Sequence, residues 1–176
     1  MKLLLFSILL SPFFILNNAR SSEKYSLEDL DALFKQESFQ EMLNHMNDIS
    51  PKKRDKKWKS LLTKGSIAYA NLNSSENECG QAFGYLSEQV KTYPFLKKEN
   101  SFLDAYTKHG ICALKNDRYY RYEWQKTGDN ITKIDPRGST LYKLSTETNY
   151  SKGFYQHILK NKNKYKKDKL VANFIH

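Results

Sequence analysis

The sequence predicts an all-α protein of stacked antiparallel helical hairpins. Apolar residues recur at helical spacing in successive segments between residues 26 and 127. Short polar turns separate these segments, and short connections imply that neighbouring helices run antiparallel. Proline follows two of the segment pairs, at Pro51 and Pro94, and the residue before a proline is disfavoured in a helix. Three successive hairpins are therefore expected.

The first hairpin is expected to begin at Ser26, which precedes Asp29 by three residues in a pattern close to a capping box. A short break at residues 35–38 separates its two helices. Each helix has one apolar face, formed by Leu27, Leu30, Leu33 and Phe34 in the first and by Phe39, Met42, Leu43 and Met46 in the second. Pro51 ends the unit.

The second hairpin is expected over residues 56–93. Between its helices, residues 73–80 are rich in Asn, Ser and Glu and predict a loop. Pro94 ends the unit. The apolar stripes comprise Trp58, Leu61, Leu62, Gly65, Ala68, Tyr69 and Leu72 in the first helix, and Phe83, Leu86, Val90 and Tyr93 in the second.

The third hairpin is expected from residue 100 onward. Asp117 is a good N-cap and Gly128 a natural C-terminal stop, so the second helix is placed between them. The first helix carries Phe102, Ala105, Tyr106, Cys112 and Leu114.

An alternative stays open for residues 118–145. Tyr120, Tyr122 and Trp124 alternate with polar residues, as in a strand, and this region would then form a small β-meander. The helix is preferred because the two boundary signals of the third hairpin agree with it.

The second hairpin resembles the tetratricopeptide-repeat family. That family has Trp, Leu, Gly and Tyr in the first helix of its repeat, Ala in the second and a closing Pro. The matching residues here are Trp58, Leu61, Leu62, Gly65, Tyr69, Ala82 and Pro94. The resemblance extends over roughly residues 26–127 as a TPR-like helical repeat. It implies a scaffold that binds peptides or proteins along a concave face, with no enzymatic activity.

The two ends of the chain are expected to differ from the repeat domain at residues 20–127. Lys2, an apolar run at residues 3–16 and a cleavable Ala19 are typical of a secretory signal peptide over residues 1–19. An uncleaved N-terminal anchor remains an alternative, although the run is shorter than the roughly 20 residues that span a bilayer. The expected location is periplasmic or secreted.

Residues 128–176 are expected to form a connector and a basic C-terminal helix packed on the repeat domain. The connector has few apolar residues and many turn formers, so it is predicted to be irregular or partly β. The helix would place Phe154, Ile158 and Tyr165 on its inward side.

Cys79 and Cys112 are the only cysteines, and an exported pair usually closes into a disulfide. Cys79 starts the second helix of hairpin two, and Cys112 ends the first helix of hairpin three. Antiparallel packing would bring these two helix ends together. His109 is the one histidine near either cysteine, so no metal site is expected, and no motif indicates a cofactor.

The net charge of +10 is unevenly distributed. Residues 51–64 carry seven basic and one acidic side chain, and residues 151–176 repeat this ratio. A solvated surface and a surface for an anionic partner are both compatible with it. The candidate binding residues are Lys52, Lys53, Arg54, Lys56 and Lys57 in the first basic segment, and Arg118, Tyr119, Arg121, Tyr122 and Trp124 in an aromatic-basic run. That run is interpreted either as packing at the repeat boundary or as a ligand surface.

The sequence contains no phosphate-binding glycine loop, nucleophile elbow or HExxH pair. The expected function is that of an exported, non-enzymatic module that binds a protein or peptide. The first alternative is a binder of anionic polymers or membrane surfaces through residues 52–59 and 160–169; nucleic acid is not the expected partner. The second is a small cell-wall enzyme, for which Glu123 and His109 would be the candidates.

Overall fold

The computed structural model describes residues 25–75, 78–150, 156 and 158–167. Within these residues all regular structure is helical and no strand occurs, so the all-α prediction is confirmed for them. The predicted signal peptide at residues 1–19 lies outside the described residues.

The first two helices are α1 (Leu27–Lys35) and α2 (Phe39–His45). The expected capping box is present, because Ser26 and Asp29 each accept a hydrogen bond from the other's backbone N–H. Two short 3₁₀ turns follow, η1 (Met46–Asp48) and η2 (Pro51–Lys53).

The middle of the chain forms α3 (Lys56–Leu72), α4 (Gly80–Thr92) and the 3₁₀ turn η3 (Pro94–Lys98). Asp55 caps α3 by accepting a 2.9 Å hydrogen bond from the backbone N–H of Trp58. Both prolines that were expected to end hairpins occupy the first residue of a 3₁₀ turn.

The remaining helices are α5 (Asn100–Asn116), α6 (Arg118–Tyr122), α7 (Trp124–Ile134), α8 (Gly138–Glu147) and α10 (Lys162–Tyr165). In the C-terminal part, Ile158 and Tyr165 are buried, as expected for an inward side, while Phe154 lies outside the described residues. The Tyr165 hydroxyl donates a 3.3 Å hydrogen bond to the Pro136 carbonyl.

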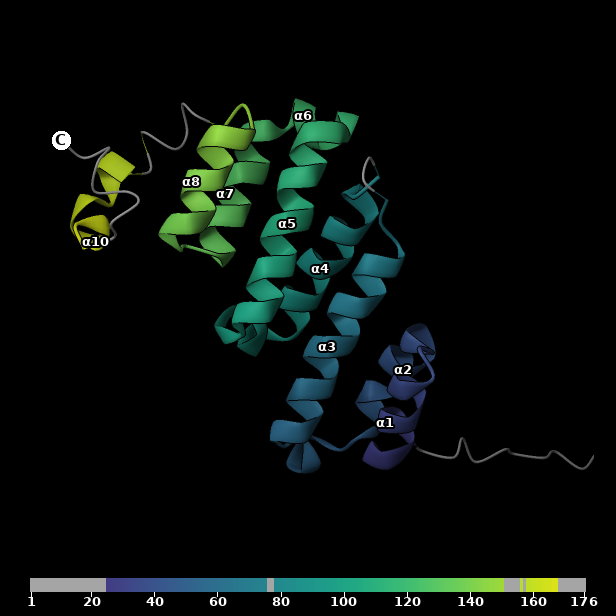
Figure 1. Cartoon of the computed structure of the whole chain (residues 1–176). Coiled ribbons are helices and arrows are strands. Elements are labelled where there is room, and N and C mark those ends of the chain that lie inside the picture. Colours follow the sequence, from purple (N-terminus) through teal and green to yellow (C-terminus); the bar gives the residue numbers. More distant parts are fainter. Residues whose placement is uncertain (1–24, 76–77, 151–155, 157, 168–176) are drawn as a thin grey trace, which may run out of the picture.

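The helices pack side by side in chain order, from α1 and α2 to α8 (Figure 1). Each helix contacts the next, with α7 taking the place after α5. In addition, α1 contacts α3, α3 contacts α5, and α5 contacts α8. These four helices therefore form one continuous row, and α2, α4 and α7 pack against it as a second row.

Two separate hydrophobic clusters fill the interior. The smaller one lies among α1, α2 and the first turns of α3, and the larger one extends from the second half of α3 to Tyr165. Tyr93 and Phe95, around the start of η3, pack against both clusters.

The irregular or partly β connector predicted for the residues after Gly128 is wrong, because α7 and α8 occupy residues 124–134 and 138–147. The β-meander alternative is wrong for the same reason. α7 also continues through Gly128, which was expected to end a helix, and the helix break lies instead at Glu123. A Cβ at Gly128 would overlap the buried ring of Tyr150, so the glycine permits close packing within a helix.

Replacing Gly128 by alanine is expected to lower the free energy of unfolding by about 1–3 kcal/mol, the usual cost of overpacking a core. The added methyl group would displace the ring of Tyr150, which is fully buried. Urea denaturation followed by circular dichroism measures the change. Gly84→Ala in α4 is the matched control, since its Cβ would come only within 3.3 Å of the Tyr120 hydroxyl. Equal destabilisation of the two variants would contradict this role of Gly128.

A buried carboxylate ties α5 to the connection between α7 and α8. Asp135 is fully buried and accepts 2.6 Å hydrogen bonds from the hydroxyls of Thr107 and Thr140. Arg137 donates two further hydrogen bonds to it, each 2.7 Å long, and reaches Asp104 on α5 at 2.8 Å. Burial opposes the charge of Asp135, but these donors outweigh burial and hold its pKa below the ordinary value.

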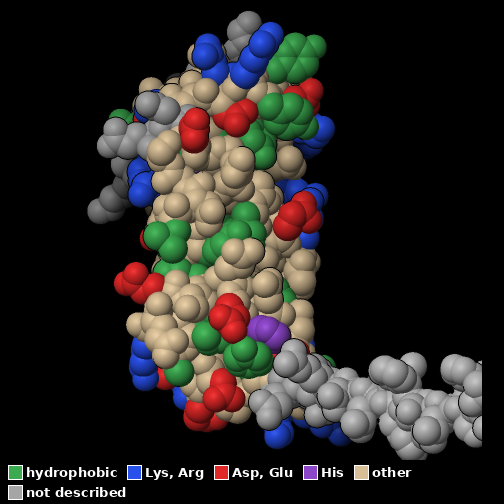
Figure 2. All heavy atoms as spheres, turned by 90° about the vertical axis from the view of Figure 1, so that its right-hand side faces the viewer, with side chains coloured by type: hydrophobic (Ala, Val, Ile, Leu, Met, Phe, Trp, Pro, Cys, Tyr) green, Lys and Arg blue, Asp and Glu red, His purple; other side chains and the backbone are tan. Residues whose placement is uncertain are grey.

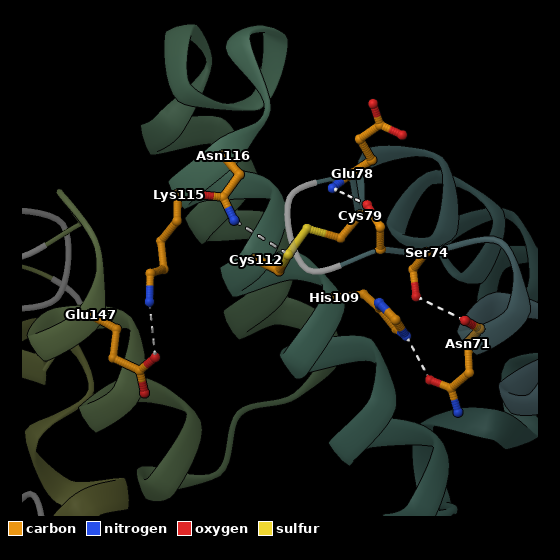
Figure 3. The surroundings of a disulfide bond; sticks show 10 residues. Asn71, Ser74, Glu78, Cys79, His109, Cys112, Lys115, Asn116 and Glu147 are labelled. Carbon is orange, nitrogen blue, oxygen red and sulfur yellow. Dashed lines mark hydrogen bonds and ion pairs between the residues drawn. A yellow bond between two sulfur atoms is a disulfide. The ribbon is translucent and has the colours of Figure 1, made fainter.

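The predicted disulfide between Cys79 and Cys112 is confirmed, with a Cα–Cα distance of 5.9 Å. It joins the N-cap of α4 to α5 (Figure 3). Because α5 continues to Asn116, Cys112 lies one turn before the end of its helix. The crosslink connects α4 to α5, and both helices contribute buried residues to the larger of the two hydrophobic clusters.

Candidate binding surfaces

The short helix α6 is held firmly on its inner side. Asp117 caps it by accepting a 2.9 Å hydrogen bond from the backbone N–H of Tyr119. A Cβ at Gly80 would overlap the Asp117 carboxylate, so the first residue of α4 has to be small. Tyr120 packs edge-on against Phe83 with ring centroids 5.2 Å apart. Burial, and then the charge of Asp117, raises the pKa of Tyr120.

The outer side of α6 carries Arg118, Tyr119, Arg121 and Tyr122, which we call the aromatic-basic surface. The side chains of Tyr119 and Tyr122 are 64% and 84% exposed, unusually high values for large aromatic residues. Neither arginine forms an ion pair with any carboxylate in the described part of the chain. Figure 2 shows basic and hydrophobic side chains side by side at the end of the molecule where Figure 1 places α6.

Surface hollows flank the aromatic-basic surface on both sides. One lies between the end of α3 and the start of α6, and its lining includes Leu72, Gln81, Asn116 and Arg118. Leu72 is 67% exposed there. The other runs from Tyr122 to residue 130 along α7. A partner can therefore contact both flanks of α6 as well as its outer side.

Trp124, which was predicted with this surface, and its neighbour Glu123 have contacts elsewhere. Trp124 is half-buried and packs edge-on against Tyr150, with ring centroids 6.3 Å apart. Glu123, a candidate catalytic residue, lies 3.5 Å from the ammonium group of Lys126. The other four residues of the aromatic-basic run lie together on the outer side of α6.

The first basic segment lies on η2 and the first turn of α3, where Lys52, Lys53, Lys56 and Lys57 are exposed. Arg54 differs, because its guanidinium donates to the Ile49 carbonyl at 2.9 Å. It also donates to the Asn47 amide oxygen at 3.1 Å and lies 4.9 Å from the Trp58 ring. Arg54 is thus engaged within the fold rather than presented to a ligand.

The fold adds lysines to this segment that the sequence interpretation missed. Trp58 packs against Tyr93 and Phe95, with ring centroids 5.7 and 6.2 Å apart, and this contact fixes η3 beside the start of α3. Lys59 lies 5.6 Å above the Phe95 ring. We call the combined surface the lysine edge; it comprises Lys52, Lys53, Lys56, Lys57, Lys59, Lys97 and Lys98. One available signal was that Pro51 and Pro94 are each followed within four residues by a lysine pair.

The two surfaces lie at opposite ends of α3. Its first turn carries Lys56 and Lys57 of the lysine edge, whereas its last residue, Leu72, lines the hollow beside Arg118. A helix of 17 residues is about 25 Å long at 1.5 Å per residue. One small ligand therefore cannot contact both surfaces.

His109 has a structural environment beside the disulfide (Figure 3). Its side chain is buried, and its Nε2 lies 3.1 Å from the Asn71 amide oxygen of α3. Burial, followed by the nearby charge of Lys108, lowers the pKa of His109. The residue thus links α3 to α5 and is not presented at either surface.

The free energy of unfolding is expected to decrease as pH falls through about 6.5, the ordinary pKa of histidine. Below that pH the unfolded chain binds a proton that buried His109 resists, so unfolding becomes more favourable. Urea midpoints measured between about pH 7.5 and 5.5 test this. His109→Gln, which can still bond to Asn71 but does not titrate, should give a smaller pH dependence. An unchanged slope would show that other groups cause it.

The described residues contain no recognisable metal site or membrane-spanning helix, and the comparisons with known proteins gave no match. Within the described ranges, no group of three His, Cys, Asp or Glu side chains could hold a metal ion. None of the described helices is long and apolar enough to cross a membrane. No protein-family model, curated protein or solved structure matches the chain. The two surfaces therefore have to be interpreted from their own chemistry.

Proposed function

We propose that this protein is an exported, non-enzymatic module that binds a protein or peptide along its helices, with the aromatic-basic surface as the main contact. The proposal has three parts: a repeat-like scaffold, a contact surface on α6 and an oxidising location.

The scaffold part is supported by how the helices alternate. Helices α1, α3, α5 and α8 touch in succession, while α2, α4 and α7 pack behind them. This arrangement is the one expected if α1–α2, α3–α4 and α5–α7 are TPR-like hairpins and α8 closes the last one. Such a scaffold offers long surfaces to extended partners.

The observation that carries the functional proposal is the composition of the outer side of α6. Two arginines and two highly exposed tyrosines stand on five residues of rigid helix. Tyr and Arg are the residue types that most often supply binding energy at protein interfaces. A guanidinium without an ion-pair partner binds carboxylates through paired hydrogen bonds. The partner is therefore proposed to present acidic side chains beside an apolar one.

The location is proposed from the disulfide and from the N-terminal pattern of the sequence. Disulfides persist in oxidising compartments and are rare elsewhere. Residues 1–19 have the composition of a secretory signal peptide. Both features support a periplasmic or secreted protein.

A peptide-display selection against the protein lacking residues 1–19 tests the function. Selected peptides should be enriched in Asp or Glu together with an apolar residue. Tyr122→Ala and Arg118→Gln/Arg121→Gln should each weaken the best peptide by about tenfold or more, the effect typical of interface hot spots. Lys133→Gln/Lys143→Gln removes the same charge from exposed positions of α7 and α8 that line neither hollow, and it should leave affinity unchanged. Equal loss in this control, or no selected peptide, would overturn the proposal.

A further inference from the structure

We infer that the lysine edge is a second binding surface, and that its ligand is a linear polyanion with repeated phosphate, sulfate or carboxylate groups. It is independent of the proposed function, because the aromatic-basic surface lies at the other end of α3. The inference rests on how the edge is assembled, on its uncompensated charge and on its lack of exposed large apolar side chains.

The tertiary fold assembles the lysine edge from two segments that are far apart in the sequence. η2 and η3 are the turns that follow α2 and α4, and each contains a lysine pair. The ring of Trp58 lies against Tyr93 and Phe95, and its indole N–H donates a 2.9 Å hydrogen bond to the Met46 carbonyl. The aromatic contacts hold η3 beside the start of α3, and the Arg54 guanidinium, which donates to the Ile49 carbonyl, ties the end of η2 to the same region. The cations are therefore brought together before a ligand arrives.

Few of the nearby carboxylates form ion pairs with the lysines of the edge. Asp55 is used to cap α3, and Asp31 lies 2.8 Å from the ammonium group of Lys35. Glu28 reaches only Lys57, at 3.7 Å. The other six lysines of the edge form no ion pair with a carboxylate in the described ranges: Lys52, Lys53, Lys56, Lys59, Lys97 and Lys98.

This concentration of charge is unfavourable for folding. α3 begins with Lys56 and Lys57, although the start of a helix disfavours positive charge, and the N-cap carboxylate of Asp55 is the one acidic group of the helix at this end. Neighbouring like charges add to the cost. Sequences that break such a local rule commonly do so at functional sites. A bound polyanion would remove this repulsion.

The composition of the edge favours a polymer in solution over a lipid bilayer. Membrane-surface binding combines basic residues with large apolar side chains that enter the lipid. Among the described residues, the exposed large apolar side chains are Leu72, Tyr119, Tyr122, Tyr142 and Leu159, none of which belongs to the edge. Phe95 is half-buried beneath Lys59 and packed on Trp58. The edge thus presents positive charge but no exposed large apolar side chain that could enter a bilayer.

A hollow between α1 and α3 extends the cationic surface. Lys56, Lys57 and Lys64 line it together with Phe34 and Asp31. A chain of anionic groups that crosses η3 and η2 can continue toward this hollow. A single small anion would use only part of the surface, so affinity is expected to rise with chain length.

Binding of long-chain linear polyphosphate to the full-length oxidised protein, measured by calorimetry at several salt concentrations, tests the inference. Affinity should fall with salt, and orthophosphate should not compete at equal phosphate concentration. Replacing Lys52, Lys53, Lys97 and Lys98 by Gln should lower affinity about tenfold or more. It should also reduce the dependence of log K on log salt by about 0.7–0.9 for each phosphate group that a lysine no longer neutralises.

The matched control replaces Lys160, Lys162, Lys166 and Lys167, four exposed lysines of the C-terminal region, by Gln. It removes the same net charge. An equal loss of affinity would show that polyphosphate is bound only by non-specific electrostatic attraction to a basic protein, and would overturn the inference. Binding to phosphatidylcholine vesicles that contain phosphatidylglycerol, without binding to polyphosphate, would assign the edge to membranes instead. Circular dichroism confirms that both variants fold.

Discussion

Replacing Arg137 by methionine is expected to lower the free energy of unfolding by about 3–5 kcal/mol at neutral pH, since removing one partner leaves a buried charge uncompensated. Arg137 supplies two of the four hydrogen bonds that side chains donate to the fully buried Asp135. Methionine has a similar length but donates no hydrogen bond. Urea denaturation at pH 7 measures the change.

The cost of this substitution should decrease in acid. In the native protein Asp135 has a lowered pKa, so its contribution to stability is present above the ordinary pKa of aspartate and is lost as pH falls below it. Without Arg137, burial is no longer outweighed and the pKa of Asp135 should rise. The variant can then relieve the buried charge by binding a proton, and its deficit relative to the native protein should shrink as pH falls.

Asp104→Asn provides the control for the second partner of Arg137. The Asp104 side chain is 70% exposed, and exposed ion pairs contribute at most about 1 kcal/mol. A larger loss in Asp104→Asn than in Arg137→Met would contradict the assignment of Asp135 as the central group. So would a deficit in Arg137→Met that does not change with pH.

Reducing the disulfide is expected to lower the free energy of unfolding by about 3–4 kcal/mol, because the crosslink restricts the unfolded chain. Cys79 and Cys112 are separated by 33 residues, and this loop includes most of α4 and α5. Urea midpoints with and without dithiothreitol should differ accordingly. The loss is a large fraction of the 5–15 kcal/mol that is typical for a domain.

The paired substitution Cys79→Ser/Cys112→Ser is the control for reduction. It should unfold at the midpoint of the reduced native protein and should not respond to dithiothreitol. If the oxidised protein and this variant had the same midpoint, the crosslink would contribute nothing to stability. Free-thiol titration before each measurement confirms the redox state.

Local signals in the sequence predicted the first five helices and the start of α6 well. The Ser26 box, the Asp117 cap and the two prolines act on neighbouring residues, so their effect does not depend on the rest of the fold. The cysteine pairing also followed, because it needs only the order of two adjacent helices.

The region after Gly128 could not be predicted in the same way. Its helices bury Thr127, Thr132 and Thr140 beside Ile131, Leu141 and Leu144, so the apolar residues alone mark only part of their buried faces. Gly128 ends no helix because a ring 22 positions later packs on it, and no local pattern contains that contact. Asp135 likewise resembled a turn residue until its partners on α5 and α8 were placed.

The candidate surfaces could be predicted only in part, because their composition also depends on tertiary contacts. Residue type alone does not separate Arg54, whose charge is used inside the fold, from its lysine neighbours. Lys97 and Lys98 join them only because the aromatic contacts of Trp58 bring η3 to the start of α3. Tertiary contacts determine which basic side chains are engaged within the fold and which ones gather on one surface.

The division of the interior into two clusters has a consequence for how the native protein opens. Tyr93 and Phe95 are the residues that touch both clusters, and the crosslink reinforces only the larger one. We therefore expect the segment of α1 and α2 to open as a unit separate from the remainder. Its amide protons should exchange with deuterium earlier than those of α4 and α5, and this region can detach from α3 while the remainder stays folded.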